Sequence, residues 1–189
     1  ERFQTDDVDY EEWYLNHKAT TEDLEKQSRQ KFAYMPTISI LVPVYNTPVV
    51  FLKQMIQSVR KQSYGKWELC IANADPENPE VAEVLKIASE KDSRIKVKNV
   101  PENEGIAQNT NAALGIATGE YAGLLDHDDL LAPDALYEVV KVLNEKECPE
   151  VIYSDEDKVT TDLSEHFQPH MKPDFNLDLL RSNNYICHL

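Results

Sequence analysis

Residues 38–72 read ISILVPVYNTPVVFLKQMIQSVRKQSYGKWELCIA, and this stretch decides the fold class. Ile38–Val42 is a short, mostly apolar and β-branched run, as expected of a strand buried on both faces. Thr47 is placed to cap a helix that has Pro48 in its first turn. That helix carries apolar residues at i, i+3, i+4 and i+7, namely Leu52, Met55, Ile56 and Val59. Trp67–Ala72 is the next strand, so the stretch predicts a βαβ unit.

The same alternation of strand and helix continues along the chain. Further strands are predicted at Ile95–Val100 and Tyr121–Leu125, and a fifth is predicted to begin at Val151–Tyr153. Further helices are predicted from Asn78-Pro79, over Ile106–Thr118 with Gly119 in the C′ position, and from Pro133. Repeated βαβ units give right-handed crossovers, a mostly parallel sheet and helices on both faces. We therefore predict an α/β, Rossmann-like fold whose first four strands lie in the order 3-2-1-4.

The composition is that of a globular protein with a strongly acidic surface. The chain has 189 residues and a formal net charge of −15. This charge argues against a nucleic-acid partner, which would need clustered Lys and Arg. Three cysteines, Cys70, Cys148 and Cys187, are too few and too scattered for a disulfide framework, and we interpret them as buried small side chains in a reducing compartment. Neither the GxGxxG fingerprint nor the P-loop is present.

Residues 1–36 differ from the rest and are predicted to form a helical extension. Tyr10, Trp13 and Tyr14 lie at i, i+3 and i+4, which places their rings on one face of a short helix. Thr20–Gln30 is polar and fits either a helix or a linker. Pro36 ends this segment, because proline stops a helix and biases its predecessor toward extended backbone. The predicted domain organisation is an extension over 1–36 and a nucleotide-binding domain over 37–189.

Polar and acidic residues follow the predicted strands, where parallel sheets bind ligands. The clearest group is Asp126-His127-Asp128-Asp129, directly after an apolar strand. In extended backbone Asp126 and Asp128 would share one face, with His127 opposite, facing solvent or the helix layer. Two such carboxylates suit Mg²⁺ or Mn²⁺. The alternative is that Asp128 or Asp129 only caps the helix that begins at Pro133.

Several segments, in order and on the predicted elements, resemble family 2 glycosyltransferases of the GT-A fold. They are Ile38–Asn46, Trp67–Leu69, Asn103–Ile106, Asn111–Leu114, Ala117–Tyr121 and Leu125–Asp129. Tyr153–Lys158 and Lys172–Leu189 resemble the branch of this family that builds bacterial surface polysaccharides.

The resemblance implies a site for a nucleotide-sugar, with UDP as the expected carrier. Its donor-binding residues would be Pro43, Val44 and Tyr45 around the base, with Asn73, Asp75, Gly105, Asn111 and Asp126. Asp126 and Asp128 match the DxD motif, in which the second Asp coordinates the divalent ion, Mn²⁺ or Mg²⁺. An acidic site holds a diphosphate only when a cation intervenes, which agrees with this assignment.

The sequence departs from the family pattern at two places. Many relatives carry Asp-Asp after the second strand, where this chain has Asn73-Ala74, so the Asn73 carbonyl or Asp75 would have to accept the base N–H. Relatives also place the catalytic base downstream of the Asn-Tyr-Ile segment. The base is therefore expected beyond Leu189, and Asp155 and Asp157 are the acidic candidates within this sequence.

The resemblance implies an inverting, metal-dependent transfer of a sugar from an NDP-sugar to a glycan hydroxyl. The resemblance implies a cytoplasmic location, with the full-length enzyme at the inner face of the membrane. Two alternatives are a sugar nucleotidyltransferase and a degenerate binding module. A sugar nucleotidyltransferase usually has a glycine-rich loop with basic residues after the first strand. Pro43–Pro48 contains neither glycine nor a basic residue. A degenerate binding module would fit the replacement of the family's Asp-Asp by Asn73-Ala74.

Overall fold

The computed structural model describes residues 9–145 and 149–186, which group into two compact units. One unit lies within residues 21–152, and the other joins residues 9–20 to residues 153–186. The predicted boundary after residue 36 coincides with neither limit, and the division into an extension and a nucleotide-binding domain stays a prediction. Among the described helices, none has the length and apolarity needed to cross a membrane.

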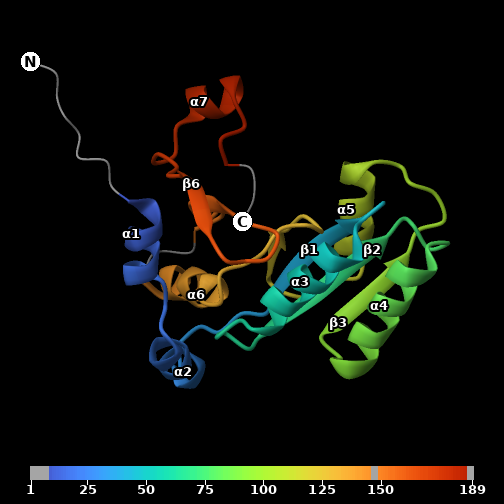
Figure 1. Ribbon diagram of the computed structural model, residues 1–189, viewed down its shortest axis with the longest axis horizontal. Coiled ribbons are helices and arrows are strands. Elements are labelled where there is room, and N and C mark those ends of the chain that lie inside the picture. The colour runs from blue at the N-terminus through green and yellow to red at the C-terminus, as the bar shows by residue number, and fades with distance from the viewer. Residues whose placement is uncertain (1–8, 146–148, 187–189) are drawn as a thin grey trace, which may run out of the picture. The chain divides into compact units, whose positions relative to one another are not determined.

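The larger unit is built around a four-stranded sheet (Figure 1). Its strands are β1 (Ile38–Val44), β2 (Trp67–Asn73), β3 (Ile95–Asn99) and β4 (Tyr121–Leu124). Every pairing is parallel and the order is β3-β2-β1-β4, which confirms the predicted topology. Because β1 and β2 lie in the middle of this order, all seven residues of each are buried.

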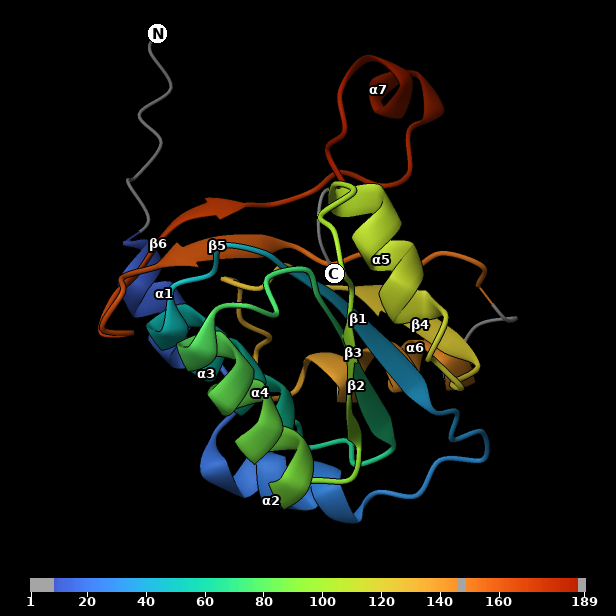
Figure 2. The same cartoon turned by 90° about the vertical axis from the view of Figure 1, so that its right-hand side faces the viewer.

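Several helices belong to the larger unit. They are α2 (Thr21–Arg29), α3 (Val49–Arg60), α4 (Pro79–Lys91), α5 (Ile106–Leu114) and α6 (Ala135–Glu145). Figure 2 shows α3 and α4 on one face of the sheet and α5 on the other. Right-handed crossovers require this arrangement, because the chain moves outward from β1 to β3 and then returns past β1 to β4.

The starts of α3 and α4 illustrate one wrong and one correct prediction. The N-cap of α3 is Pro48, which makes no side-chain capping bond, and the Thr47 hydroxyl instead donates to the Tyr45 carbonyl over 3.5 Å. Asn78 caps α4 as predicted, because its side-chain oxygen accepts hydrogen bonds from the Glu80 and Val81 amides. The predicted apolar face of α3 is confirmed by its buried residues, Leu52, Met55, Ile56 and Val59.

The predicted end of the third helix is wrong by four residues. Helix α5 ends at Leu114 and Gly115 is its C-cap, with the Gly115 amide donating to the Asn111 carbonyl. Gly119 serves another purpose, since it lies against the start of β1. A Cβ at Gly119 would come within 2.5 Å of the Thr37 carbonyl oxygen and 2.6 Å of the Ser39 hydroxyl. Close approach of two backbone segments, rather than helix termination, therefore requires this glycine.

We expect Gly119→Ala to destabilise the fold by about 1–3 kcal/mol, because the added methyl group must displace backbone atoms of β1. Urea unfolding measures the effect. The matched control is Gly65→Ala, since a Cβ at Gly65 would meet no atom within 4 Å. If the two variants lose equal stability, the close approach at Gly119 is not the cause.

A buried carboxylate connects the amino ends of three strands. Glu68 is 6% exposed and accepts hydrogen bonds from the Ser39 hydroxyl at 2.7 Å and from Lys96 Nζ at 2.6 Å. It also accepts from the Thr118 amide, the Thr118 hydroxyl at 2.8 Å and the Gly119 amide at 3.2 Å. Burial alone would raise the pKa of Glu68, but the bonds from Lys96, Thr118 and Ser39 outweigh it and lower the pKa to about 2. Glu68 thus fixes the turn from which β4 begins.

Cys70 lies beside this carboxylate and is fully buried in β2. Burial and the neighbouring Glu68 raise the pKa of its thiol to about 12, so Cys70 is not a nucleophile at neutral pH. This agrees with its predicted role as a small core side chain. Cys148 and Cys187 lie outside the described residues.

The smaller unit combines α1 (Tyr10–His17) with β5 (Glu156–Val159), β6 (His166–His170) and α7 (Leu177–Ser182). The predicted helix at Tyr10 is confirmed. The Tyr10 hydroxyl donates to Asp157 at 2.7 Å, and the ring of Tyr14 stacks on His166 at 3.8 Å between centroids. These two contacts attach α1 to the β5–β6 hairpin.

The predicted fifth strand is wrong in position and in pairing. Residues 151–155 form no strand, and β5 pairs antiparallel with β6 instead of joining the parallel sheet. The strand that does form, Glu156–Val159, carries charged side chains that a strand buried inside a parallel sheet could not satisfy. In the hairpin Glu156 pairs with His170 at 3.0 Å and Lys172 at 3.2 Å, and Asp157 pairs with His166 at 2.8 Å.

Candidate functional site

The candidate site begins where β1 ends. Pro43 and Val44 are buried within the strand, whereas Tyr45, the next residue, is 49% exposed. The Val44 carbonyl accepts a hydrogen bond from the Ala74 amide at 2.9 Å, so the ends of β1 and β2 are held together. An exposed aromatic ring directly after a buried strand offers a face on which a flat ligand can stack.

Asn73 and Asp75 follow at the end of β2 and differ in what they can offer a ligand. Asn73 is 1% exposed, its Nδ2 donates to Asn99 Oδ1 at 3.1 Å, and its Oδ1 accepts from the Asp75 amide at 3.1 Å. The Asn73 carbonyl accepts from the Val100 amide at 2.8 Å. Asp75 is half-buried and uses Oδ2 to accept from Asn78 at 3.2 Å. Of the two acceptors left open by the sequence, the geometry favours Asp75.

The loop after β3 holds a further group of polar side chains. Gly105 has a φ of 94°, where only glycine fits readily, and is the N-cap of α5. Asn111, expected to line the site, is exposed, whereas Asn109 is 3% exposed. Asn109 and Ala113 are the buried residues of α5, one turn apart. This i, i+4 relation is the sequence signal that would have identified Asn109 as the sheet-facing asparagine.

The acidic segment after β4 does not continue the strand. Strand β4 ends at Leu124, and the Asp129 amide donates to the Asp126 carbonyl at 3.3 Å, which makes a turn. The predicted alternation of Asp126, His127 and Asp128 is therefore wrong, because it assumed extended backbone. His127 was predicted to face solvent or the helix layer. Its ring instead contacts the end of β1, where its Nδ1 lies 3.1 Å from the Pro43 carbonyl oxygen. That contact holds the acidic turn against the end of β1.

The carboxylates of this turn suit a hard divalent cation. The Asp128 side chain is 54% exposed, and Asp126 is half-buried beside it. The described residues contain no group of three or more His, Cys, Asp or Glu that could hold a metal by themselves. A cation bound together with a phosphate needs only one or two carboxylates, so Asp126 and Asp128 fit that mode of binding.

The two acidic candidates for the catalytic base belong to the smaller unit. Asp155 Oδ1 accepts from the Lys172 amide at 2.6 Å. Asp157 Oδ2 accepts from the Tyr10 hydroxyl and lies 2.8 Å from His166 Nδ1. The side chain of Lys172 is 1% exposed and its Nζ bonds to Glu156 and to the Ile186 carbonyl. Asp155 and Asp157 thus hold the hairpin together.

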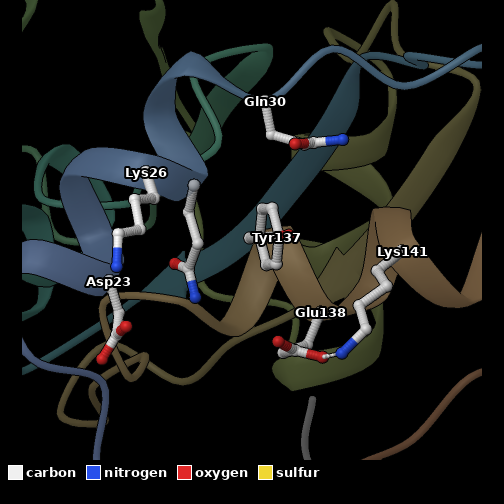
Figure 3. Close-up of a pocket in the computed structure, with 7 residues that line it drawn as sticks. Asp23, Lys26, Gln30, Tyr137, Glu138 and Lys141 are labelled. Atoms are coloured by element: carbon white, nitrogen blue, oxygen red, sulfur yellow. Dashed lines mark hydrogen bonds and ion pairs between the residues drawn. The ribbon is translucent and has the colours of Figure 1, made fainter.

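A hollow of about 300 Å³ lies between α2 and α6 (Figure 3). It is lined by Asp23, Lys26, Gln27, Gln30, Tyr137, Glu138 and Lys141. Its cations are paired within their own helices, Lys141 with Glu138 at 2.9 Å and Lys26 with Glu22 at 2.8 Å. None of the predicted site residues lines it.

Comparison with known proteins shows the family of this chain. A model described as Glycosyl transferase family 2 matches residues 39–188. Protein y4gI of Sinorhizobium fredii is 47% identical over 154 residues, covering 82% of this chain and 17% of that protein. O-antigen biosynthesis protein RfbC of Myxococcus xanthus is 29% identical over 181 residues, covering 96% of this chain and 14% of that protein.

Solved structures show the same architecture. Mannosyltransferase PcManGT from Pyrobaculum calidifontis, in complex with GDP-Man and Mn²⁺, superposes with a TM-score of 0.53 at 21% identity, over 76% of this chain and 41% of that one. TarS from S. aureus in complex with UDP-GlcNAc superposes with a TM-score of 0.53 at 22% identity, over 58% of this chain and 31% of that one.

The sheet order and these neighbours define the fold as GT-A. The chain belongs to glycosyl transferase family 2. It spans less than a fifth of the length of the two sequence relatives, at 17% and 14%.

Proposed function

We propose that this chain binds a nucleoside diphosphate sugar, with UDP as the carrier, and transfers the sugar with inversion to a glycan hydroxyl in polysaccharide biosynthesis. The observation that carries the proposal is the placement of Tyr45, Asp75 and Asp128 after the parallel strands β1, β2 and β4. Ligands of α/β sheets bind at this edge. One relative is named as an O-antigen biosynthesis protein, and the solved neighbours hold GDP-Man or UDP-GlcNAc.

Each proposed residue has a separate task. The exposed ring of Tyr45 would stack on the base, and the Asp75 carboxylate would accept a hydrogen bond from the ring N–H of that base. Asp126 and Asp128 would hold Mn²⁺ or Mg²⁺ at the diphosphate. When bound, the cation supplies Lewis-acid stabilisation of the departing diphosphate. His127 keeps the acidic turn at β1 through the Pro43 carbonyl, so the stacking ring and the carboxylates stay at one edge.

Inversion requires in-line attack by an acceptor hydroxyl that loses its proton to a base. Asp155 and Asp157 are the candidate bases that we propose within this chain. Each accepts its hydrogen bonds inside the smaller unit through one oxygen, Oδ1 of Asp155 and Oδ2 of Asp157, so the second carboxylate oxygen would receive the proton.

Calorimetric titration with UDP tests the donor site. We expect saturable binding in the presence of Mn²⁺ and a large loss of affinity after chelation with EDTA, because the acidic edge repels an unneutralised diphosphate. Adenosine without phosphates serves as a control for stacking alone. Absence of Mn²⁺-dependent UDP or GDP binding would reject the proposed function and favour an inert binding module.

A further inference from the structure

We propose that the hollow between α2 and α6 is a second carbohydrate site, which holds one residue of the glycan that the protein extends. The inference rests on the proposed function for the class of its ligand, a neutral sugar within a glycan chain. The hollow shares no lining residue with the proposed donor site. Its support is a braced cavity, an aromatic ring in its wall, and a balanced set of hydrogen-bonding groups around that ring.

The two helices that form the hollow are braced against each other. The Ser63 hydroxyl donates to Gln27 Oε1 at 2.7 Å and the Ser63 amide donates to the Pro133 carbonyl at 2.8 Å, so Ser63 links α2 to the segment that opens α6. The Asn144 side chain exchanges hydrogen bonds of 2.9 and 2.8 Å with the backbone of Tyr34, which fixes the last turn of α6. A cavity held in this way exists before its ligand arrives, as is usual for small-molecule sites.

The wall of the hollow includes the aromatic ring of Tyr137. Figure 3 shows this ring between Lys26 on α2 and Lys141 on α6. Tyr137 is half-buried and rests against Phe32, with 5.3 Å between the ring centroids, so the ring is kept in place. The carbon-bound hydrogens of a sugar ring form an apolar face that can pack on such a ring, while the phenol hydroxyl can bond to a sugar hydroxyl.

The other lining side chains are polar, and their charges cancel. They comprise two carboxylates, two ammonium groups and two amides, namely Asp23, Glu138, Lys26, Lys141, Gln27 and Gln30.

This balance favours a neutral ligand rich in hydroxyl groups. A hydroxyl both donates and accepts, so it can bond to ammonium groups, amides and carboxylates alike. An anion would face the two carboxylates of the hollow and the net charge of −15 of the chain. The ion pairs of Lys26 and Lys141 are exposed and therefore weak, so these side chains can exchange a carboxylate for a sugar hydroxyl.

The hollow is braced by segments that lead into the amino ends of the strands. Tyr34 precedes β1 and Ser63 precedes β2, whereas Tyr45 and Asp75 of the proposed donor site follow the carboxyl ends of the same strands. Seven residues of parallel strand span about 20 Å, so one sugar residue cannot reach both sites. A sugar in the hollow would therefore belong to a part of the glycan remote from its reacting end.

NMR titration of the ¹⁵N-labelled chain with chitotetraose and with maltotetraose, two neutral oligosaccharides, tests the site without nucleotide or metal. We expect saturable shifts of the side-chain amide signals of Gln27 and Gln30 with at least one of the two. The dissociation constant should be on the order of 1 mM, because a single sugar residue offers few atoms for contact. Tetragalacturonate, which carries carboxylates, should not bind.

Two variants and a control assign the binding to the hollow. Gln30→Ala changes an exposed side chain and should weaken binding about fivefold, the equivalent of one hydrogen bond. Tyr137→Ala should abolish binding. If that variant fails to fold because it loses the contact with Phe32, Tyr137→Phe retains the ring and should weaken binding as Gln30→Ala does. The matched control is Gln57→Ala, an exposed glutamine of α3 outside the hollow, which should leave the affinity unchanged.

Two results would overturn the carbohydrate site: absence of shifts at Gln27 and Gln30 with both neutral probes, or a preference for tetragalacturonate. Equal affinity in the unmodified chain and in Gln30→Ala and Tyr137→Phe would also overturn it. The donor site is tested separately, because Mn²⁺-dependent binding of UDP involves none of these residues. If UDP binds and the oligosaccharides do not, this inference alone fails. If the oligosaccharides bind and neither UDP nor GDP does, the proposed function fails.

Discussion

Asp128→Asn is expected to abolish Mn²⁺-dependent binding of UDP, with a loss of affinity of about 100-fold or more. Even residues that only support metal ligands typically cost 10–100-fold when changed, and Asp128 is proposed as a direct ligand. The substitution retains the size of the side chain and removes its charge. Because Asp128 is 54% exposed, the fold should be unaffected, and circular dichroism can verify this. Calorimetric titration with and without Mn²⁺ gives the affinities.

Two companion variants distinguish coordination from simple electrostatics. Glu102→Gln removes one exposed negative charge from the loop after β3, and it should leave UDP affinity unchanged or slightly improved. His127→Ala loses the contact with the Pro43 carbonyl, worth about 1 kcal/mol, and should weaken binding several-fold. If Asp128→Asn retains full Mn²⁺-dependent affinity for UDP, Asp128 is not a ligand of the metal ion.

The second large effect concerns the stability of the larger unit. The pKa of Glu68 is about 2 in the fold and 4.5 when the chain is unfolded. A lowered pKa stabilises the fold fully above the unfolded value, and this contribution is lost as pH falls from about 5 to 2. Since each pKa unit corresponds to about 1.4 kcal/mol, the contribution is about 3 kcal/mol. Urea unfolding at a series of pH values should reveal it.

Glu68→Ala is expected to cost about 3–5 kcal/mol at pH 7, because it leaves the Thr118 amide without its acceptor and Lys96 without its carboxylate partner. The control is Glu22→Gln, which breaks an exposed ion pair with Lys26 and should cost less than about 1 kcal/mol. A Glu68→Ala variant with the same acid sensitivity as the unmodified chain would show that another carboxyl group is responsible.

The spacing of apolar residues predicted β1, β2 and α3. In each of these elements the buried residues are the ones whose position in the strand or helix faces the core. The handedness of the crossovers fixed the face of the sheet on which each connecting helix lies. Neither argument specifies what a side chain meets across the fold. Gly119 resembles a helix C-terminus in sequence, but its role is set by β1, which lies 80 residues earlier.

The same limit applies to the candidate site. The position of Asp126 and Asp128 after β4 was predictable, but the turn that orients them depends on a bond between Asp129 and Asp126. The asparagines after β3 show the point most clearly. Their residue type predicts a polar loop, whereas the orientation of the Asn103 amide depends on Gly105 and Asn109, which the sequence does not place.

The smaller unit has a consequence for the order of events during synthesis. The hydrogen bond from Tyr10 to Asp157 joins residues 147 positions apart, whereas the larger unit lies within one continuous stretch. At typical translation rates of about 5–20 residues per second, α1 leaves the ribosome on the order of ten seconds before its hairpin is made. A helix of eight residues is marginal alone in water. The larger unit can therefore fold first, while α1 docks only after His166 has been synthesised.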